Sequence, residues 1–128
     1  MFLDRFTKTE FKSYEDYYEN YNVNIPENFN FSYDVLDELA KIRPDSPALV
    51  WCNDFGDEET FTFAQMAEKT NQTANFFSSL GIKKGDFVML ILKRHHEFLP
   101  SILALHKIGA VTIPATHLLT KQIGRAHV

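Results

Sequence analysis

An α/β fold is predicted by three neighbouring segments in the second half of this 128-residue chain. Residues 87–92 form the run FVMLIL, whose two apolar faces are typical of a parallel strand covered by helices on each side. Residues 94–108 are apolar nearly all round, which indicates a deeply buried helix. Residues 110–114 form a second short apolar segment after Gly109. This order predicts a βαβ unit with a right-handed crossover, in which Pro100 must lie near the first turn of the helix.

The helix that precedes this unit carries the clearest start signal in the chain. Thr62 and Gln65 have the spacing of a capping box, in which each side chain satisfies the other residue's free backbone N–H. Apolar and small residues then recur at three- and four-residue steps, and Gly81 follows as a left-handed stop. The stripe expected to face the core consists of Phe63, Met66, Ala67, Thr70, Ala74 and Phe77.

A helix and a hairpin are predicted upstream of this capping box. Ser32 is the expected cap of a helix through residue 43, with Pro44 as its end. Its apolar face would consist of Leu36, Leu39, Ala40 and Arg43. Residues 48–53 and 59–61 have strand character, and the sequence DFGDE between them favours a hairpin.

Residues 1–28 are predicted to form an N-terminal helical arm. Ser13 can cap a short helix over residues 13–20, and Pro26 breaks the helical pattern afterwards. The arm is rich in Phe and Tyr. We expect these aromatic side chains to act as buried anchors against a larger body rather than as a binding stripe.

The composition argues against a nucleic-acid-binding, membrane-spanning or secreted protein. A net charge of −4 with dispersed acidic residues argues against a nucleic-acid partner, which requires a basic surface. The longest apolar run, residues 87–92, is too short to span a bilayer. Cys52 is the single cysteine, and the first residues lack the pattern of a secretion signal, so a cytoplasmic location is expected.

Isolated reactive residues are interpreted as structural. His95 and His96 are adjacent at an expected helix start without a third ligand at zinc spacing, so a solvated helix start is expected and no metal site is predicted. His106 is expected in the interior, and Cys52 in strand packing. No two glycines are close enough to form a phosphate-binding nest, and no catalytic residue is assigned.

Four segments carry a resemblance to a known family, in the order DSPALVWCN (45–53), ETFTFAQM (59–66), GIKKGDFVMLIL (81–92) and LHKIGAVTIPATHLLT (105–120). Residues 29–121 resemble the N-terminal part of bacterial medium-chain acyl-CoA synthetases, within the AMP-binding, adenylate-forming superfamily. The resemblance implies that they form the N-terminal βαβ portion of the large N-terminal domain of such a ligase.

The resemblance also implies a reaction. Members of the family join a carboxylic acid to ATP as acyl-AMP, with Mg²⁺ spreading the phosphate charge, and then transfer the acyl group to CoA. The phosphate loop, the acidic nucleotide motif and the lysine-bearing lid that this chemistry needs do not occur in the sequence. We therefore expect an inactive, truncated N-terminal piece whose missing partner is the remainder of its own domain.

Thr116, His117 and Leu118 are the one set of residues with an expected ligand role. They follow the carboxyl end of a parallel strand, where open α/β sheets bind ligands. In the resembled family, the corresponding loop lies near the path of the pantetheine arm of CoA. A plain connecting loop is the alternative.

The last residues suggest a non-native tail. Residues 123–128 are one translation of the sequencing-adapter end ATC GGA AGA GCA CAC GTC, and the preceding bases AG would complete a CAG codon for Gln122. The hypothesis is that residues 122–128 are adapter sequence, and different codons there would refute it.

Two alternatives to a piece of an acyl-CoA ligase remain open. The chain could be a small standalone α/β module that binds or interacts without catalysis. It could also derive from an aryl-CoA ligase or a peptide-synthetase adenylation domain, because the residues of the acyl pocket would lie beyond residue 121.

Overall fold

The computed structural model describes residues 2–120, so the tail predicted for residues 122–128 lies outside the described residues. The elements follow one another in the order η1 (Phe2–Arg5), α1 (Tyr14–Asn20), η2 (Ser32–Asp37), α2 (Glu38–Ile42), β1 (Pro47–Cys52), β2 (Glu58–Thr62), α3 (Phe63–Ser79), β3 (Phe87–Leu90), α4 (Phe98–Ile108) and β4 (Val111–Pro114).

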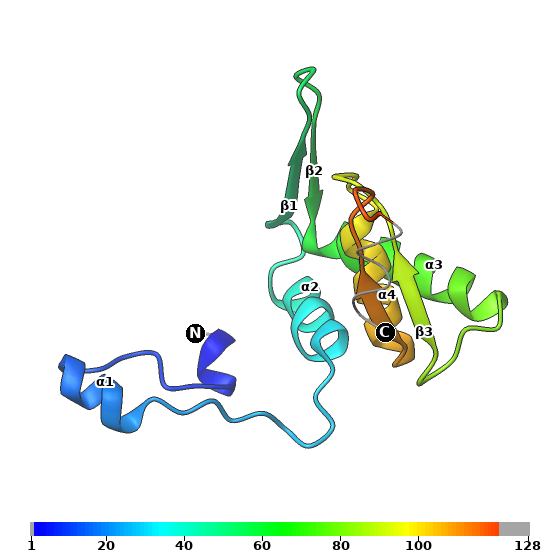
Figure 1. Ribbon diagram of the computed structural model, residues 1–128. Coiled ribbons are helices and arrows are strands. Elements are labelled where there is room, and N and C mark those ends of the chain that lie inside the picture. Colours follow the sequence, from blue (N-terminus) through cyan, green and yellow to red (C-terminus); the bar gives the residue numbers. More distant parts are fainter. Residues whose placement is uncertain (1, 121–128) are drawn as a thin grey trace.

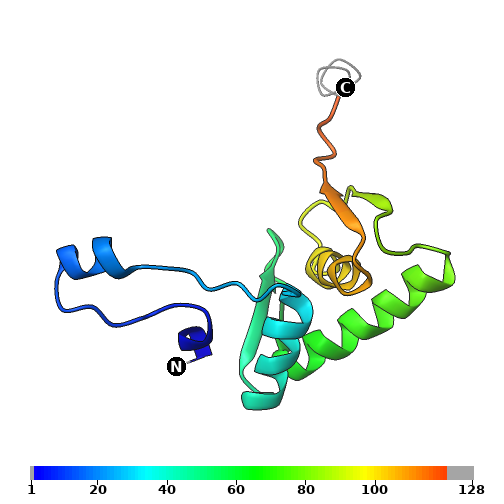
Figure 2. The same cartoon turned by 90° about the horizontal axis from the view of Figure 1, so that it is seen from below.

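Helix α4 lies at the centre of the fold. Figures 1 and 2 show it between the β3–β4 pair on one side and helices α2 and α3 on the other. Leu103 joins a core cluster with Leu36, Phe61 and Met66, whereas Leu105 joins a second cluster with Leu90 and Ala110. Each residue of an α-helix is rotated by about 100° from the one before it, so residues two apart point to nearly opposite sides. One helix can therefore supply both clusters.

The predicted βαβ unit and the α/β class are confirmed. Strands β3 and β4 pair in parallel from Phe87↔Val111 to Leu90↔Pro114, and α4 connects them. Within residues 2–120, however, only one face of this sheet is buried, and the expected cover on the other face stays a prediction. Phe87 is 74% exposed and Met89 55%, whereas Leu90 is 7% exposed. The described part of the chain therefore leaves an apolar sheet face open.

Helix α4 begins four residues later than predicted, at Phe98 instead of residue 94. Pro100 explains the difference. A start at residue 94 would place its ring inside the helix against the preceding turn and remove a hydrogen bond. The observed start leaves Pro100 in the first turn, as its chemistry requires.

The hairpin and the capping box are confirmed. Strands β1 and β2 pair antiparallel, and α3 starts where the Gln65 N–H donates to Thr62 Oγ1 and the Thr62 N–H donates to Gln65 Oε1. Gly81 has φ of 88° and so provides the left-handed stop. The packing role predicted for Cys52 is wrong, because this residue is exposed at the end of β1.

The helix predicted over residues 32–43 is split into η2 and α2, and its cap is not Ser32. The Ser32 N–H donates to Asn30 Oδ1, so Asn30 satisfies a free donor at the helix start. The Ser32 side chain is buried and its hydroxyl donates to the Leu103 carbonyl at 2.7 Å. Asn30 also donates to the carbonyl of His106, whose side chain is half-buried rather than interior.

The N-terminal arm departs most from the expected packing. Ser13 caps α1 as predicted, since its Oγ accepts from the Asp16 N–H. Yet Tyr14 and Tyr18 are 72% and 77% exposed, and Figures 1 and 2 show α1 projecting away from the rest of the chain. The expected anchors are therefore wrong for these tyrosines. The arm boundary at residue 28 stays a prediction.

A lysine on α4 ties three helical segments together. Lys107 Nζ lies 2.7 Å from Asp37 Oδ2 on η2 and 2.6 Å from Asn71 Oδ1 on α3, above the ring of Tyr33. Its side chain is only 5% exposed. Because a buried charge is costly without its partner, this contact fixes how α4 meets η2 and α3.

We predict that Lys107→Met lowers the free energy of unfolding by about 3 kcal/mol, because it leaves the Asp37 carboxylate without its partner. Urea denaturation followed by circular dichroism measures the change. Adding Asp37→Asn should recover part of the loss. The matched control is Lys41→Met, since Lys41 pairs with Glu38 but is 72% exposed, and it should leave the free energy of unfolding nearly unchanged. Equal losses for the two lysines would contradict the structural role of Lys107.

Candidate functional site at the carboxyl ends of the parallel strands

The parallel register brings two loops to the same edge of the β3–β4 sheet. The Ala115 N–H donates to the Leu90 carbonyl at 2.9 Å, so the chain leaves both strands at the same level. The loop after β3 contains Lys93 and Arg94, and the loop after β4 contains Thr116 and His117. Ligands of open α/β sheets bind at this edge.

A hollow of about 400 Å³ lies between these loops. The residues predicted from the sequence, Thr116, His117 and Leu118, all line it. The other lining residues are Leu92, Lys93, Arg94, Phe98, Pro114 and Ala115. The structure thus places the predicted residues together at a concave surface, and their ligand role stays a prediction.

The loop after β4 is shaped by a threonine. Thr116 Oγ1 accepts from the Leu118 N–H at 3.2 Å, and the Leu119 N–H donates to the Thr116 carbonyl. This local hydrogen bonding forms a turn. Leu118 is 70% exposed, so the turn leaves an apolar side chain at the mouth of the hollow.

The loop after β3 is held by the hairpin. Trp51 Nε1 donates to the Arg94 carbonyl at 2.6 Å. The His96 ring packs against Trp51 and Phe61 with centroid distances of 5.5 and 5.2 Å. This contact corrects the expectation that His96 lies in a solvated helix start. Residues 2–120 contain no group of three side chains suited to hold a metal ion.

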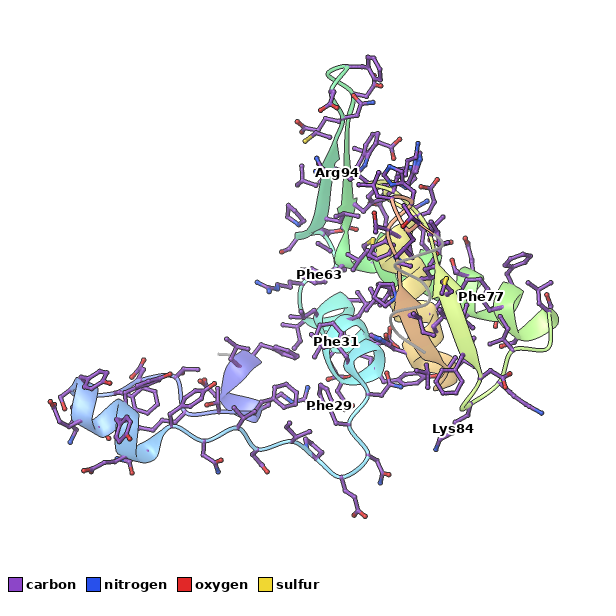
Figure 3. The ribbon with its side chains drawn as sticks, in the orientation of Figure 1. Phe29, Phe31, Phe63, Phe77, Lys84 and Arg94 are labelled. Carbon is purple, nitrogen blue, oxygen red and sulfur yellow. The ribbon has the colours of Figure 1, made fainter. Side chains whose placement is uncertain are left out.

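Sequence reasoning did not assign a role to Lys93 and Arg94. Figure 3 shows Arg94 at the hairpin end of the sheet and Lys84 at the opposite end. Two cations, a hydroxyl and an imidazole beside Phe98 and Leu118 suit a ligand that is anionic in one part and apolar in another. A basic pair directly after a parallel strand was the signal that could have found them.

The glycines of the described residues do not form a phosphate nest. A phosphate nest needs successive backbone N–H groups that converge on the anion. Each glycine with positive φ lies instead in a separate turn; these are Gly56, Gly81, Gly85 and Gly109. None of the helices in residues 2–120 has the length and hydrophobicity that a bilayer crossing demands.

Comparison with known proteins shows which protein family this chain belongs to. The model of the AMP-binding enzyme family matches residues 36–123. The human mitochondrial acyl-coenzyme A synthetase ACSM3 is 35% identical over 122 residues, which cover 91% of this chain and 21% of that protein. The chain therefore spans about a fifth of the length of the curated relatives it matches.

Solved structures share the fold. A fatty acyl-CoA synthetase from Mycobacterium tuberculosis aligns with a TM-score of 0.64 and 31% identity, covering 71% of this chain and 17% of that one. The N-terminal subdomain of NpsA from Klebsiella oxytoca aligns with a TM-score of 0.62 and 30% identity, covering 70% of this chain and 22% of that one. This chain belongs to the family of AMP-binding enzymes.

Proposed function

We propose that this chain is an N-terminal scaffold piece of an ATP-dependent acyl-CoA ligase. In full length, that enzyme forms an acyl adenylate from a small carboxylic acid and then an acyl-CoA thioester, with a medium-chain fatty acid as the proposed substrate. Membership in the AMP-binding enzymes supports this proposal, as does the similarity to ACSM3 and to the mycobacterial fatty acyl-CoA synthetase.

The observation that carries the proposal is the open face of the β3–β4 sheet. Phe87 and Met89 on β3, and Ile91 just after its end, are all more than half exposed. Val111 and Ile113 on the neighbouring strand β4 are also exposed. A contiguous apolar face of this kind marks a surface that another layer covers. The proposed partner of this face is the remainder of the same domain.

ATP and Mg²⁺ belong to the proposed full-length enzyme and not to this chain. The described residues offer neither a phosphate nest nor a group of metal ligands, so no catalytic step is assigned to them. CoA is different, because the proposed path of its pantetheine arm passes Thr116, His117 and Leu118. The nearby Lys93 and Arg94 supply positive charge that suits a phosphorylated cofactor.

Two alternatives differ in what they require. A peptide-synthetase adenylation domain is supported by the similarity to the Klebsiella structures, one of which is an artificially fused adenylation–PCP di-domain, and an aryl-CoA ligase stays open beside it. Residues of an acyl pocket would decide between these ligases, and a longer DNA sequence of the gene is the observation that would supply them. A standalone binding module would need a bulge or charges on its sheet, whereas β3 and β4 pair in unbroken register and expose apolar residues.

A cytoplasmic location is proposed from the single cysteine, Cys52. The curated relatives carry a mitochondrial location in their names. The two compartments therefore have to be compared directly in cells.

We predict that the purified 128-residue chain catalyses no ATP–pyrophosphate exchange with octanoate above the protein-free background. The reason is that the phosphate loop and the acidic nucleotide motif of the resembled family do not occur in its sequence. Human ACSM3 assayed in the same buffer serves as the positive control for the assay conditions. Octanoyl-AMP formed by the pure chain would contradict the proposal.

The scaffold role itself is tested in a fusion protein in which residues 1–120 replace the matched segment of human ACSM3. We expect this fusion to form acyl-CoA. His117→Ala should raise its KM for CoA about fivefold, the effect of losing one hydrogen bond, without changing acyl-AMP formation. Lys83→Gln at the opposite end of the sheet is the control and should change neither step. An inactive fusion, or equal KM values for His117→Ala and its parent, would refute the proposal.

A further inference from the structure

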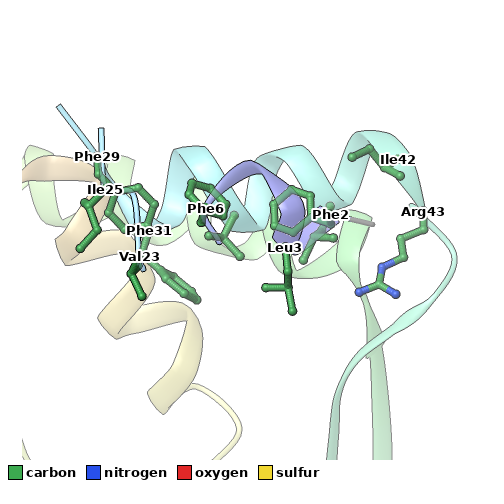
Figure 4. A pocket seen from close by; sticks show the side chains of 11 residues that line it. Phe2, Leu3, Phe6, Val23, Ile25, Phe29, Phe31, Ile42 and Arg43 are labelled. Atoms are coloured by element: carbon green, nitrogen blue, oxygen red, sulfur yellow. The ribbon is translucent and has the colours of Figure 1, made fainter. Parts of the chain in front are cut away.

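An apolar groove of about 770 Å³ lies between the N-terminal arm and helices η2 and α2, on a different part of the molecule from the strand ends (Figure 4). Its size is in the range of small-molecule sites. The arm contributes Phe2, Leu3, Phe6, Val23 and Ile25, and Phe29 follows directly after it. The helical side contributes Phe31, Val35, Leu39, Ile42 and Arg43.

Among the described residues that line this groove, Arg43 alone carries a charge. Figure 4 shows Arg43 beside Ile42 at one end, whereas Val23, Ile25 and Phe29 lie at the other. The groove is therefore polarised along its length. One end offers a guanidinium and the rest offers aromatic and aliphatic surface.

The sequence explains how Arg43 reaches this position. Pro44 disfavours helical backbone at the residue before it. Arg43 accordingly leaves α2 with φ of −147° and ψ of 66°. The helical face predicted to include Arg43 therefore ends one residue earlier, and the Arg43 side chain lines the groove instead of continuing the buried stripe.

The guanidinium of Arg43 is available to an anion. It lies 5.1 Å from the centre of the Phe63 ring and makes no ion pair within residues 2–120. Arg5 on the nearby 3-10 helix differs, because its Nη1 is 3.2 Å from Glu38 Oε2. The hydrogen bond from Lys41, and then the charges of Lys41 and Arg5, hold the pKa of Glu38 below its usual value, so that carboxylate stays ionised beside Arg5.

We propose that this groove binds a straight-chain fatty acid, with the carboxylate on Arg43 and the alkyl chain running toward Val23 and Ile25. The planar guanidinium suits a carboxylate because it can donate two parallel hydrogen bonds. Phe2, Leu3 and Phe6 would cover the alkyl chain of the ligand along the middle of the groove. The groove is separate from the hollow at the strand ends, and this inference does not rest on the function proposed above.

The polarity of the groove distinguishes this ligand from other occupants. A second copy of the chain or the remainder of a longer protein would cover apolar surface without requiring an anion at Arg43. A neutral alkyl chain would fill the groove equally well at either end. Only an amphiphile with an anionic head uses both features, and a fatty acid is the simplest such molecule.

The test is a titration of the 128-residue protein, ¹³C-labelled at Ile, Leu and Val methyl groups, with dodecanoate and separately with dodecanol. We expect dodecanoate to shift the signals of Leu3, Ile25 and Ile42 and to bind about tenfold more tightly than dodecanol, the effect of one charge-assisted contact. Arg43→Gln should remove that tenfold preference and leave dodecanol binding unchanged. Leu3→Asp should weaken both ligands.

Lys83→Gln is the matched control, because it removes an exposed cation far from the groove and should alter neither affinity. Several results would overturn the proposal. They are the absence of dodecanoate binding, equal affinity for acid and alcohol in the wild-type protein, and shifts confined to Ile91 and Ile113 on the open sheet face. Shifts of Leu3 and Ile25 that follow protein concentration without ligand would assign the groove to a second copy instead. The wild-type comparison decides even if Arg43→Gln fails to fold.

Discussion

The two-sided burial of helix α4 is the constraint on which the rest of the structure depends. Leu103 packs toward α3, η2 and the hairpin, whereas Leu105 packs toward the β3–β4 sheet. Ala104 and Leu105 are fully inaccessible to solvent. Polar contacts reinforce the same helix, since its backbone carbonyls accept from Ser32 and Asn30. Helix α4 therefore fixes the position of the parallel strands relative to the other helices, with Phe77 of α3 adding a contact to the Leu105 cluster.

The open sheet face and the two loops at its end are the features of the structure that bear on function. The face is apolar where a further layer would cover it, and the strand ends converge on a hollow that contains cations and a turn. Both features fit a chain that belongs to the AMP-binding enzymes and spans about a fifth of its relatives. The groove at Arg43 lies on a separate surface, so a ligand there would add a function to the scaffold.

Local signals in the sequence predicted most of the fold. The capping box at Thr62, the stop at Gly81 and the turn between β1 and β2 depend on residues close in sequence, so their patterns are readable. The errors arose from tertiary contacts. Asn30 rather than Ser32 caps the helix, because the Ser32 hydroxyl donates to a carbonyl of α4. The His96 ring is partly buried rather than solvated, because it packs against Trp51 and Phe61. The site loop was predictable from strand order, but Arg43 was not, because its groove forms between segments distant in sequence.

Hydrogen–deuterium exchange of the intact chain, followed residue by residue by NMR, tests the central role of α4 most directly. If α4 joins both core clusters into one unit, the amides of Met66, Leu90 and Leu105 should open with the same free energy. The exposed tip of the hairpin should exchange faster. Exchange of Leu90 through a separate, lower-energy opening while Met66 and Leu105 stay protected would show that the sheet and the helices are independent, and would contradict the account.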